Sequence, residues 1–339
     1  MLIKTLLSVS LTALLLTAVP VAAEPFRLIV TDLTPPLVPN SVMDLAVNLG
    51  YFEREGVDVE LVRVQQTPLA ITALQAGEGE MANVGVDTAL QLVARDQLDL
   101  RAVTSPSKSL FFLIAASDAI ATPDQLVGHS YGIGRIGSVD HGLSKQVLAS
   151  MNVDIDSLDL AALGQPSVRA QALAAGQIDA TTMSLGSWTT LPDKTGLHIL
   201  VDPDVYFAAA PVVSKVNVVT PEVLETRRAD VEAVVTALIK LSRDIAADPK
   251  IWVDAMVEAR PDINRADLEM LATAYGKSWA VNGGLSAKEL AFTADWNFKS
   301  EDFAGLTPVP LSDWVDFSVT DAVLAKLGGP IADRDPADR

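Results

Sequence analysis

Two overlapping glycine-rich patterns are the places where residue type and spacing could support chemistry in this chain. Gly128-His129-Ser130-Tyr131-Gly132 matches the G-x-S-x-G elbow that presents the nucleophilic serine of many hydrolases. That elbow needs a strand before the serine and a helix after it. Here residues 124–127 predict a helical turn and residues 131–134 predict a strand, so the order is reversed. A secreted α/β hydrolase using Ser130 is therefore kept only as an alternative function.

The second pattern, Gly132-x-Gly134-x-x-Gly137, has the spacing of a dinucleotide-binding fingerprint. The acid that should end the next strand stands instead at its start, as Asp154 or Asp156. We therefore expect no nicotinamide cofactor, and no cofactor of another kind. A glycine-rich turn before a helix can still hold a polar or anionic group on free backbone N–H groups, and Ser138 can cap that helix or contact a ligand.

Metal and thiol chemistry have no support in the sequence. The three histidines, His129, His141 and His198, are isolated and lack the paired spacing of zinc sites. The segment 154–156 lacks the glycine and the terminal glutamate of a calcium loop. The chain has no cysteine, which excludes disulfides, thiolate metal sites and cysteine nucleophiles. We expect neither a catalytic nor a metal site.

Length and charge narrow the class of protein. The chain has 339 residues, with 43 Asp and Glu against 25 Lys and Arg, which gives a formal charge of −18 and a pI near 4.5. An acidic surface repels phosphate backbones, so we expect no nucleic-acid partner. This length suits two domains of about 150 residues each.

The N-terminus has the pattern of a secretory signal peptide at residues 1–23. Lys4 supplies the positive charge, residues 6–16 are an apolar stretch, and Val21-Ala22-Ala23 provides small residues for cleavage after Ala23. A membrane anchor is the alternative, but the apolar stretch is short for a span. We expect a mature protein that is exported to the periplasm.

Strand and helix patterns alternate from Phe26 to about Val201. Short β-rich runs such as 26–31 and 81–84 are separated by helical segments such as 68–76 and 88–95. This alternation predicts an α/β fold with mostly parallel sheets. Beyond Pro221 the pattern becomes helical, and its first helix carries one apolar face: Val231, Val234, Val235, Leu238, Leu241 and Ile245.

An internal repeat divides this alternation in two. Residues 73–77, ALQAG, recur as ALAAG 99 residues later, and Glu80 and Asp179 follow the two copies at equivalent places. Chance in an alanine-rich chain is one explanation. The interpretation that we favour is two similar α/β lobes that share a cleft. Ligands of open α/β sheets bind outside the carboxyl ends of the strands, so residues 85–88 and 184–188 are predicted to face each other.

Residues 49–60, LGYFEREGVDVE, resemble the GYF-x-x-EG-(L/V)-x-V signature of ABC-transporter substrate-binding proteins. The branch is the NMT1/THI5-like one, also called SsuA/TauA-like, whose members are of the nitrate, sulfonate, taurine and thiamine-precursor type. Pro39-Asn40, the ALQAG segment, Asp124–Gly128 and Ala247-Asp248-Pro249 agree with it in order. The resemblance covers about residues 26–296.

This resemblance implies a two-lobe type II periplasmic-binding-protein fold with mixed, mostly parallel sheets and a helical C-terminal region. We expect lobe one at residues 24–107 plus 212–339 and lobe two at 110–210, with hinges near 104–109 and 209–214. The resemblance also implies a non-enzyme that passes a small-molecule ligand to an ABC permease and its ATPase. We expect a monomer. A ligand sensor of the same fold is a further alternative.

The residues expected at the cleft are mostly neutral hydrogen-bonding groups: Thr34, Asn40, Asp87, Thr88, Ser138, Ser184, Ser187 and Trp188. Asp87 could pair with a ligand ammonium or cap a helix, and Trp188 could stack on the ligand or pack between lobes. Arg135 is the only arginine close to this set, so no arginine clamp for an anion is evident. Asp140 would also compete with an anion for the helix end. A neutral or zwitterionic ligand is favoured over a sulfonate or nitrate.

Overall fold

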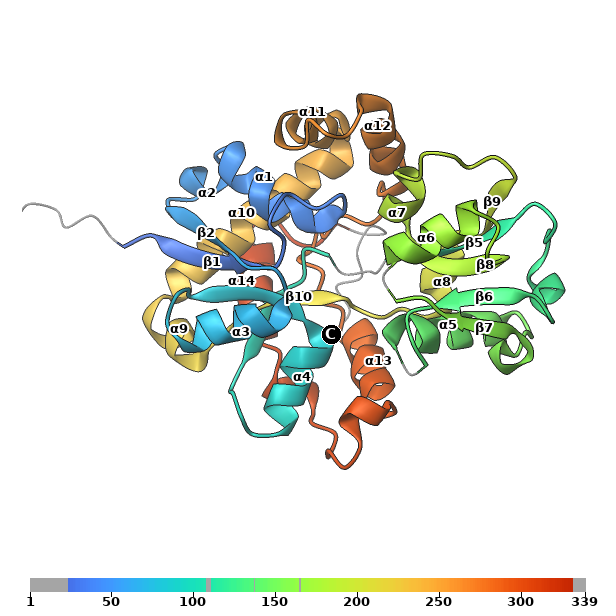
Figure 1. The fold of residues 1–339 in the computed structure, drawn as a ribbon. Coiled ribbons are helices and arrows are strands. Elements are labelled where there is room, and N and C mark those ends of the chain that lie inside the picture. Colours follow the sequence, from blue (N-terminus) through green and yellow to red (C-terminus); the bar gives the residue numbers. More distant parts are fainter. Residues whose placement is uncertain (1–23, 108–110, 137, 165, 332–339) are drawn as a thin grey trace, which may run out of the picture.

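The structure is a computed structural model, and it describes residues 24–107, 111–136, 138–164 and 166–331 (Figure 1). The predicted signal peptide lies outside the described residues. Within those ranges no helix has the length and apolar character needed to cross a membrane.

Ten strands of the described residues form two five-stranded sheets. The first sheet has the order β2-β1-β3-β10-β4 and the second has the order β7-β6-β8-β5-β9. The strands of the first are β1 (Phe26–Val30), β2 (Val59–Arg63), β3 (Met81–Gly85), β4 (Arg101–Thr104) and β10 (Lys215–Val219). Those of the second are β5 (Phe112–Ser117), β6 (Ser130–Ile133), β7 (Asp159–Ala162), β8 (Ala180–Ser184) and β9 (Leu197–Val201).

Each sheet is mixed and mostly parallel, as the sequence predicts. In the first sheet β1 pairs in parallel with β2 and β3, while β10 runs antiparallel to both β3 and β4. In the second sheet β6 pairs in parallel with β7 and β8, while β5 runs antiparallel to both β8 and β9. The α/β fold class is therefore confirmed.

Strand β10 comes after the whole second sheet in the chain, yet it lies between β3 and β4 of the first. The chain therefore passes from one sheet to the other after β4 and returns before β10. We propose the lobe boundaries 24–107 plus 212–339 and 110–210, and this strand order supports them. Lobe one is the part built around the first sheet, and lobe two is the part built around the second.

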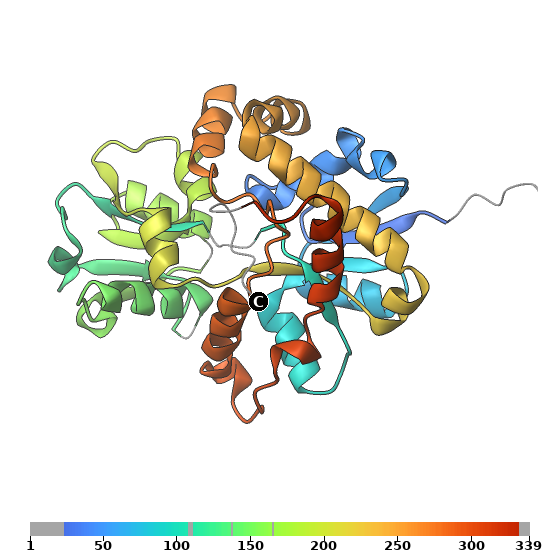
Figure 2. The same cartoon turned by 180° about the vertical axis from the view of Figure 1, so that it is seen from behind.

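Helices cover both sheets (Figures 1 and 2). Those that follow strands of lobe one are α1 (Val42–Asn48), α2 (Tyr51–Arg54), α3 (Thr67–Gln75) and α4 (Val86–Ala94). Those of lobe two are α5 (Val139–Ser150), α6 (Pro166–Ala174), α7 (Leu185–Thr189) and α8 (Pro203–Ala209). The C-terminal helices are α9 (Pro221–Thr226), α10 (Arg228–Ala247), α11 (Lys250–Ala259), α12 (Arg265–Ala274), α13 (Ala287–Phe298) and α14 (Phe317–Lys326).

After α1, Gly50 takes a left-handed conformation (φ 68°) and a second short helix, α2, follows it. One predicted helix limit is wrong. Helix α4 was expected to start at Thr88 and starts at Val86, because Gly85, the last residue of β3, already occupies the N-cap position.

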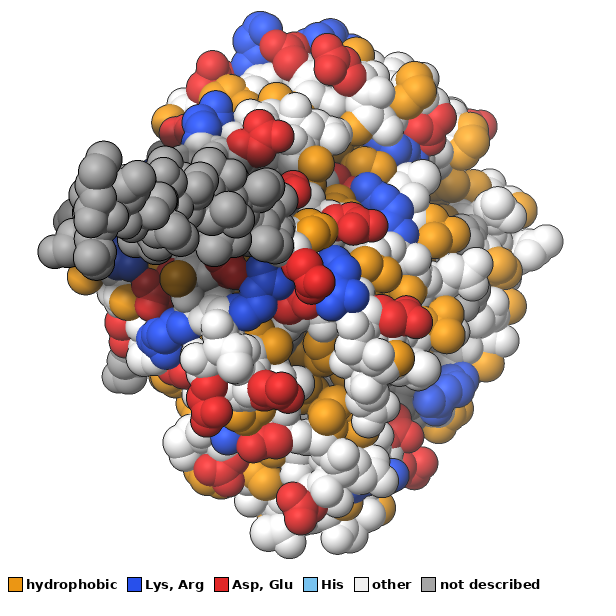
Figure 3. Space-filling model, turned by 90° about the vertical axis from the view of Figure 1, so that its left-hand side faces the viewer, with side chains coloured by type: hydrophobic (Ala, Val, Ile, Leu, Met, Phe, Trp, Pro, Cys, Tyr) orange, Lys and Arg blue, Asp and Glu red, His pale blue; other side chains and the backbone are white. Residues whose placement is uncertain are grey.

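The apolar face of α10 packs on lobe one. Val231, Val234 and Leu238 are buried, and α10 contacts α1, α2 and α14. Figure 2 shows α14 beside α10 on this side of the molecule. On the face in Figure 3, basic side chains lie next to acidic ones and form no patch of one sign.

Other C-terminal elements reach both lobes. Helix α12 contacts α7, and the hydroxyl of Tyr275, which follows α12, donates to the carbonyl of Leu37 at 2.6 Å. Helix α13 contacts α4, and the ring of its Trp296 lies so close to Gly142 of α5 that a Cβ there would be 2.9 Å from it. The C-terminal region therefore contacts both lobes.

Candidate functional site

The carboxyl ends of the parallel strands in the two lobes meet at the centre of the molecule. Leu37 lies in the loop after β1, and Gly186 lies in α7, directly after β8. A Cβ placed on Gly186 would be 3.8 Å from the Leu37 Cβ. The two strand ends therefore contact each other through these loops, where ligands of α/β sheets are expected.

We call the carboxyl ends of the parallel strands in the first sheet the lobe-one edge, and those in the second sheet the lobe-two edge. The lobe-one edge carries a cation, Lys215, that was not predicted from the sequence. Lys215 begins β10, and its Nζ donates to Thr31 Oγ1 at 2.8 Å and lies 3.4 Å from Asp32 Oδ2. Thr31 and Asp32 directly follow β1. The signal is weak in sequence because Lys215 reaches this edge only through the return of β10 to the first sheet.

The lobe-two edge carries a second missed cation, Arg169 of α6, which is only 2% exposed. Its Nε donates to Thr181 Oγ1 at 3.2 Å, its Nη2 donates to the Thr182 carbonyl at 3.1 Å, and its Nη1 donates to the Gly164 carbonyl. Asp140 Oδ2 lies 3.4 Å from Nη2. Each nitrogen of the guanidinium already has a partner, so Arg169 orders this edge.

Asp140 therefore has a different role from the one expected. Its Oδ2 accepts the backbone N–H of Gly134 at 2.7 Å and faces Arg169. The carboxylate thus fastens the glycine-rich turn to the start of α5, and its charge is balanced by a buried guanidinium.

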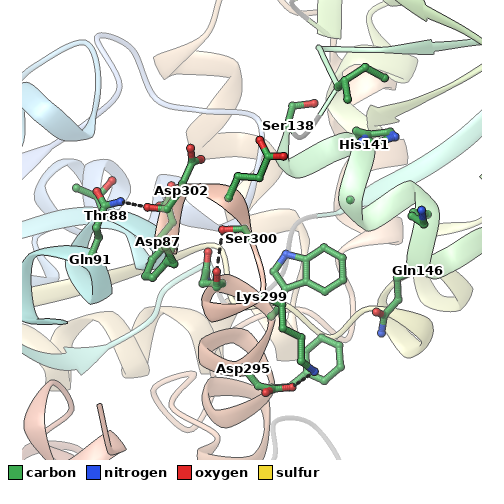
Figure 4. Close-up of a pocket in the computed structure, with 18 of the residues that line it drawn as sticks. Asp87, Thr88, Gln91, Ser138, His141, Gln146, Asp295, Lys299, Ser300 and Asp302 are labelled. Carbon is green, nitrogen blue, oxygen red and sulfur yellow. Dashed lines mark hydrogen bonds and ion pairs between the residues drawn. The ribbon is translucent and has the colours of Figure 1, made fainter. Parts of the chain in front are cut away.

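A groove of about 940 Å³ opens between α4, α5 and α13, and it contains three of the predicted residues. Figure 4 shows Asp87 and Thr88 on α4 facing Ser138 and His141 at the start of α5, with Asp295, Lys299 and Ser300 on the α13 side. The ring of Trp296 also lines the groove. Gln91 Nε2 donates to the Asp302 carbonyl at 2.7 Å, and this bond links the α4 side of the groove to the segment after α13 (Figure 4).

Two of these residues were considered as helix caps, and neither side chain makes a capping hydrogen bond. Asp87 lies in the first turn of α4, whose N-cap is Gly85. Its carboxylate is therefore placed near the positive end of the helix without capping it. Ser138 occupies the N-cap of α5, but its hydroxyl donates back to the Arg135 carbonyl at 2.7 Å.

The other five predicted residues are not among the described residues that line this groove. Thr34 is exposed, and Asn40 is buried. Ser184 caps α7, with its Oγ 3.1 Å from the backbone nitrogen of Ser187. Trp188 is 8% exposed and belongs to a core cluster, which agrees with the packing interpretation.

The arrangement around Ser130 does not resemble a nucleophile and its base. Ser130 begins β6, at the opposite end of the strand from the lobe-two edge. Its hydroxyl donates to Asp179 Oδ2 at 2.7 Å, and His129 Nδ1 lies 3.3 Å from that same oxygen. The hydrogen bonds from Ser130 hold the pKa of Asp179 below its ordinary value, which makes this carboxylate a poorer base. Among the described residues no group of three His, Asp or Glu is placed to hold a metal ion.

A model of the NMT1/THI5-like family matches residues 42–251, more than half of the chain. No curated protein sequence matches the chain. Among solved structures, a putative sulfonate ABC transporter periplasmic sulfonate-binding protein, SsuA, from Methylobacillus flagellatus superposes with a TM-score of 0.72 at 15% identity, over 91% of this chain and 98% of that one.

Two further solved structures define what this likeness shows. A Candida albicans protein described as having the generic periplasmic-binding-protein fold gives a TM-score of 0.58 at 15% identity, over 92% of this chain and 97% of that one. The desulfurization enzyme DSZB gives 0.61 at 16% identity, over 89% and 99%. At these identities the likeness shows the fold, and that fold includes an enzyme as well as binding proteins.

Proposed function

Because the chain belongs to the NMT1/THI5-like family, we propose that it is the solute-binding component of an ABC importer. It captures a small polar organic molecule between its two lobes and delivers it to a membrane permease that works with an ATPase. The observation that carries the proposal is the meeting of two polar strand edges, which hold cations and hydroxyls but no nucleophile with a matching base among the described residues. The protein acts as a monomer in the periplasm, a location supported by the signal-peptide pattern at residues 1–23.

The charges at the two edges favour a neutral or zwitterionic ligand. Lys215 lies beside Asp32, and Arg169 lies beside Asp140, so each cation already has a carboxylate next to it. A simple anion would have to compete with these carboxylates for the cations. A zwitterion can also place its own cation beside the carboxylates, and a neutral heteroaromatic molecule has no charge that competes with them. Sulfonate binding, as named for the Methylobacillus flagellatus protein, is the competing ligand class.

Thermal shift and calorimetry on the mature protein test the proposal with taurine, ethanesulfonate, nitrate and 4-amino-2-methylpyrimidine. A true ligand at 100 times its Kd stabilises the fold by about 2.7 kcal/mol. Lys215→Met should weaken binding about tenfold, while Lys326→Met, an exposed lysine on α14, should leave it unchanged. Tight nitrate or ethanesulfonate binding lost in Arg135→Ala would overturn the preference for neutral ligands.

The alternative of a secreted hydrolase makes a different prediction. Ester turnover that disappears in Ser130→Ala would support it and contradict a pure binding role. The hydrogen bond that the Ser130 hydroxyl donates to Asp179 argues against this outcome.

Ligand capture is also expected to close the lobes about two crossovers, near residues 104–109 and 209–214. Residues 108 and 109 lie outside the described part of the chain. Pro106 and Pro211 restrict the backbone within these segments. An unchanged radius of gyration in solution scattering, with and without saturating ligand, would count against closure.

A further inference from the structure

Three buried asparagines form a hydrogen-bonded chain through lobe one. Asn40 lies in the 3-10 helix η1 (Pro39–Ser41), Asn83 in β3, and Asn217 opposite it in β10. Asn40 Nδ2 donates to Asn83 Oδ1 at 3.0 Å, and Asn83 Nδ2 donates to Asn217 Oδ1 at 2.7 Å. We call these side chains the amide chain. Each is at most 2% exposed.

The direction of the amide chain is set at its inner end by two methionines. Asn217 Nδ2 lies 3.4 Å from Met81 Sδ and 3.6 Å from Met43 Sδ. A thioether sulfur accepts hydrogen bonds but cannot donate them. The NH₂ group of Asn217 must therefore face the sulfurs, and its carbonyl must face Asn83. Because the Asn217 carbonyl faces Asn83, Asn83 must turn its NH₂ group to Asn217 and its carbonyl to Asn40. Asn40 must then turn its NH₂ group to Asn83.

The outer end of the amide chain is consequently an acceptor. Asn40 Oδ1 is buried, and it has no hydrogen-bond partner among the described residues. A buried polar atom left without a partner lowers the stability of the protein, because its lost hydration is not replaced by a hydrogen bond. A ligand that donates a hydrogen bond to this oxygen would recover that cost, whereas a ligand with only acceptor atoms would add repulsion.

The place of Asn40 is compatible with contact to a ligand held between the lobes. It ends the loop after β1, in which Leu37 approaches Gly186 of α7. Asn83 lies two residues before Gly85, where β3 gives way to α4. The amide chain thus runs beneath the lobe-one edge and ends in the loop that meets lobe two.

We propose that Asn40 Oδ1 accepts a hydrogen bond from the ligand, so that the protein selects molecules carrying an N–H or O–H donor at that end. Asn83, Asn217, Met43 and Met81 act as positioning residues, because they fix Asn40 as an acceptor without touching the ligand. This inference rests on the proposed solute-binding function. It specifies the ligand class as a compound with an N–H or O–H donor at that end, such as an amine, an ammonium, a ring N–H compound or an alcohol.

Matched pairs of probes test the selection by calorimetry. Taurine and 1-propanesulfonate differ in replacing an ammonium by a methyl group, and 4-amino-2-methylpyrimidine and 2,4-dimethylpyrimidine differ in replacing an amine by a methyl group. In at least one pair, the compound that carries the N–H donor should bind at least ten times more tightly than its methyl analogue. Asn40→Leu should reduce that preference to less than threefold.

The positioning role has a sharper test in Met43→Leu/Met81→Leu. Leucine keeps the volume of methionine but removes the sulfurs, so the amide chain loses its preferred direction and Asn40 can present its NH₂ group. The donor preference should fall about tenfold. The matched control is Met183→Leu/Met256→Leu, which makes the same change at two buried methionines outside the amide chain and should leave the preference unchanged.

The direction can also be read without any ligand. Nuclear Overhauser effects should connect the side-chain NH₂ protons of Asn217 with the methyl groups of Met43 and Met81. Their absence would overturn the inference, as would a ligand complex in which only a water molecule meets Asn40 Oδ1. Equal falls in preference in both methionine pairs would contradict the positioning role.

The two proposals fail in different ways. If the two members bind equally well to the wild-type protein in every probe pair that binds, the donor selection is wrong and solute binding stands. If no probe binds at all, the proposed function itself is contradicted, and the donor selection with it.

Discussion

The two lobes repeat one backbone plan with different polar interiors. Strands β1, β2, β3, β10 and β4 of lobe one have the same order and directions as β6, β7, β8, β5 and β9 of lobe two. Helices α3 and α6 are nine residues long and begin 99 residues apart, at Thr67 and Pro166. Each is followed by a left-handed glycine, Gly77 or Gly176.

The acids that follow the two glycines, Glu80 and Asp179, also make equivalent hydrogen bonds. Glu80 accepts the backbone N–H of Arg27 near the start of β1, at 2.6 Å. Asp179, 99 residues later, accepts the backbone N–H of Ser130 at the start of β6, at 2.9 Å. The internal repeat found in the sequence therefore reflects a repeated structural unit. Chance similarity does not explain two acids with the same partner position.

The equivalent interior positions differ between the lobes. Asn83 of β3 faces Asn217, whereas its equivalent Thr182 of β8 faces Ile114. Thr182 Oγ1 is bonded to the hydroxyls of Tyr131 and Ser144, at 2.8 and 2.7 Å. Apolar spacing and turn glycines are thus enough to repeat the backbone, and the polar groups beneath each edge are free to take separate roles. In lobe one, the amide chain ends at Asn40 Oδ1, which has no hydrogen-bond partner among the described residues. In lobe two, the hydroxyls of Thr182, Tyr131 and Ser144 are hydrogen-bonded to one another.

The largest effect on the free energy of unfolding is expected at Arg169, where the interiors of the two lobes differ most. Its equivalent on α3 is Ala70, which is also buried. Arg169→Met should destabilise the protein by about 3–5 kcal/mol, because it leaves the Asp140 carboxylate without its cation and removes a donor from the Gly164 and Thr182 carbonyls. Urea unfolding measures this.

Arg135→Met is the control for that experiment. Arg135 is exposed, and its replacement should change the free energy of unfolding by less than about 0.5 kcal/mol. A cost below about 1 kcal/mol for Arg169→Met would show that the lobe-two edge does not depend on this guanidinium. The two lobes would then be more alike than their interiors suggest.

Replacing Glu80 or Asp179 should have an intermediate effect on the free energy of unfolding. The effect should be larger for Glu80, in lobe one. Burial raises the pKa of Glu80, but hydrogen bonds from Arg27 outweigh this and hold its pKa below the ordinary value. The pKa of Asp179 is also lowered, chiefly by Ser130. The side chain of Glu80 is 13% exposed and that of Asp179 is 40% exposed, so solvent screens the second more. Glu80→Gln should cost about 1–2 kcal/mol and Asp179→Asn about 0.5 kcal/mol.

The pH dependence of these costs has a definite sign. A carboxylate whose pKa is lowered in the folded state stabilises the protein above its unfolded pKa, and that stabilisation is lost as the pH falls through the folded value. Urea unfolding should therefore show the full cost of Glu80→Gln at pH 7. The variant and the wild type should begin to converge below about pH 4 and coincide only once the pH is below the lowered pKa of Glu80 in the folded state. A cost that persists in acid would mean that the charge of Glu80 is not what matters.

Local patterns in the sequence were sufficient for the elements of each lobe. Apolar runs located the strands, and Gly77 and Gly176 marked the helix ends as predicted. The start of α4 was misplaced by two residues because Gly85 could end the strand or begin a turn. Such limits depend on backbone geometry that residue type constrains only weakly.

The site was harder to predict because its parts come from distant segments. Asp87 and Thr88 were found because they closely follow a predicted strand, and Ser138 because it ends a glycine-rich turn before a helix. Lys215 was missed because its position depends on β10 returning to the first sheet, and nothing near residue 215 signals that return. Asn83 and Asn217 are 134 residues apart, and neither belongs to a recognisable local pattern. Arg169 stands in a helix segment whose repeat carries alanine, so the repeat gave no hint of its role.

The smallest effect, and the one that should be equal in the two lobes, is expected at Gly77 and Gly176. Their φ angles are 73° and 64°, and no described atom lies within 4 Å of a Cβ placed on either. An alanine would therefore meet no steric obstacle, and its cost is only that of holding an L-residue in the left-handed region, about 1 kcal/mol at each site. Thermal unfolding of Gly77→Ala and Gly176→Ala should show equal decreases. A clearly larger loss at one glycine would mean that its lobe strains this turn, and that the repeated unit is not energetically equivalent in the two halves.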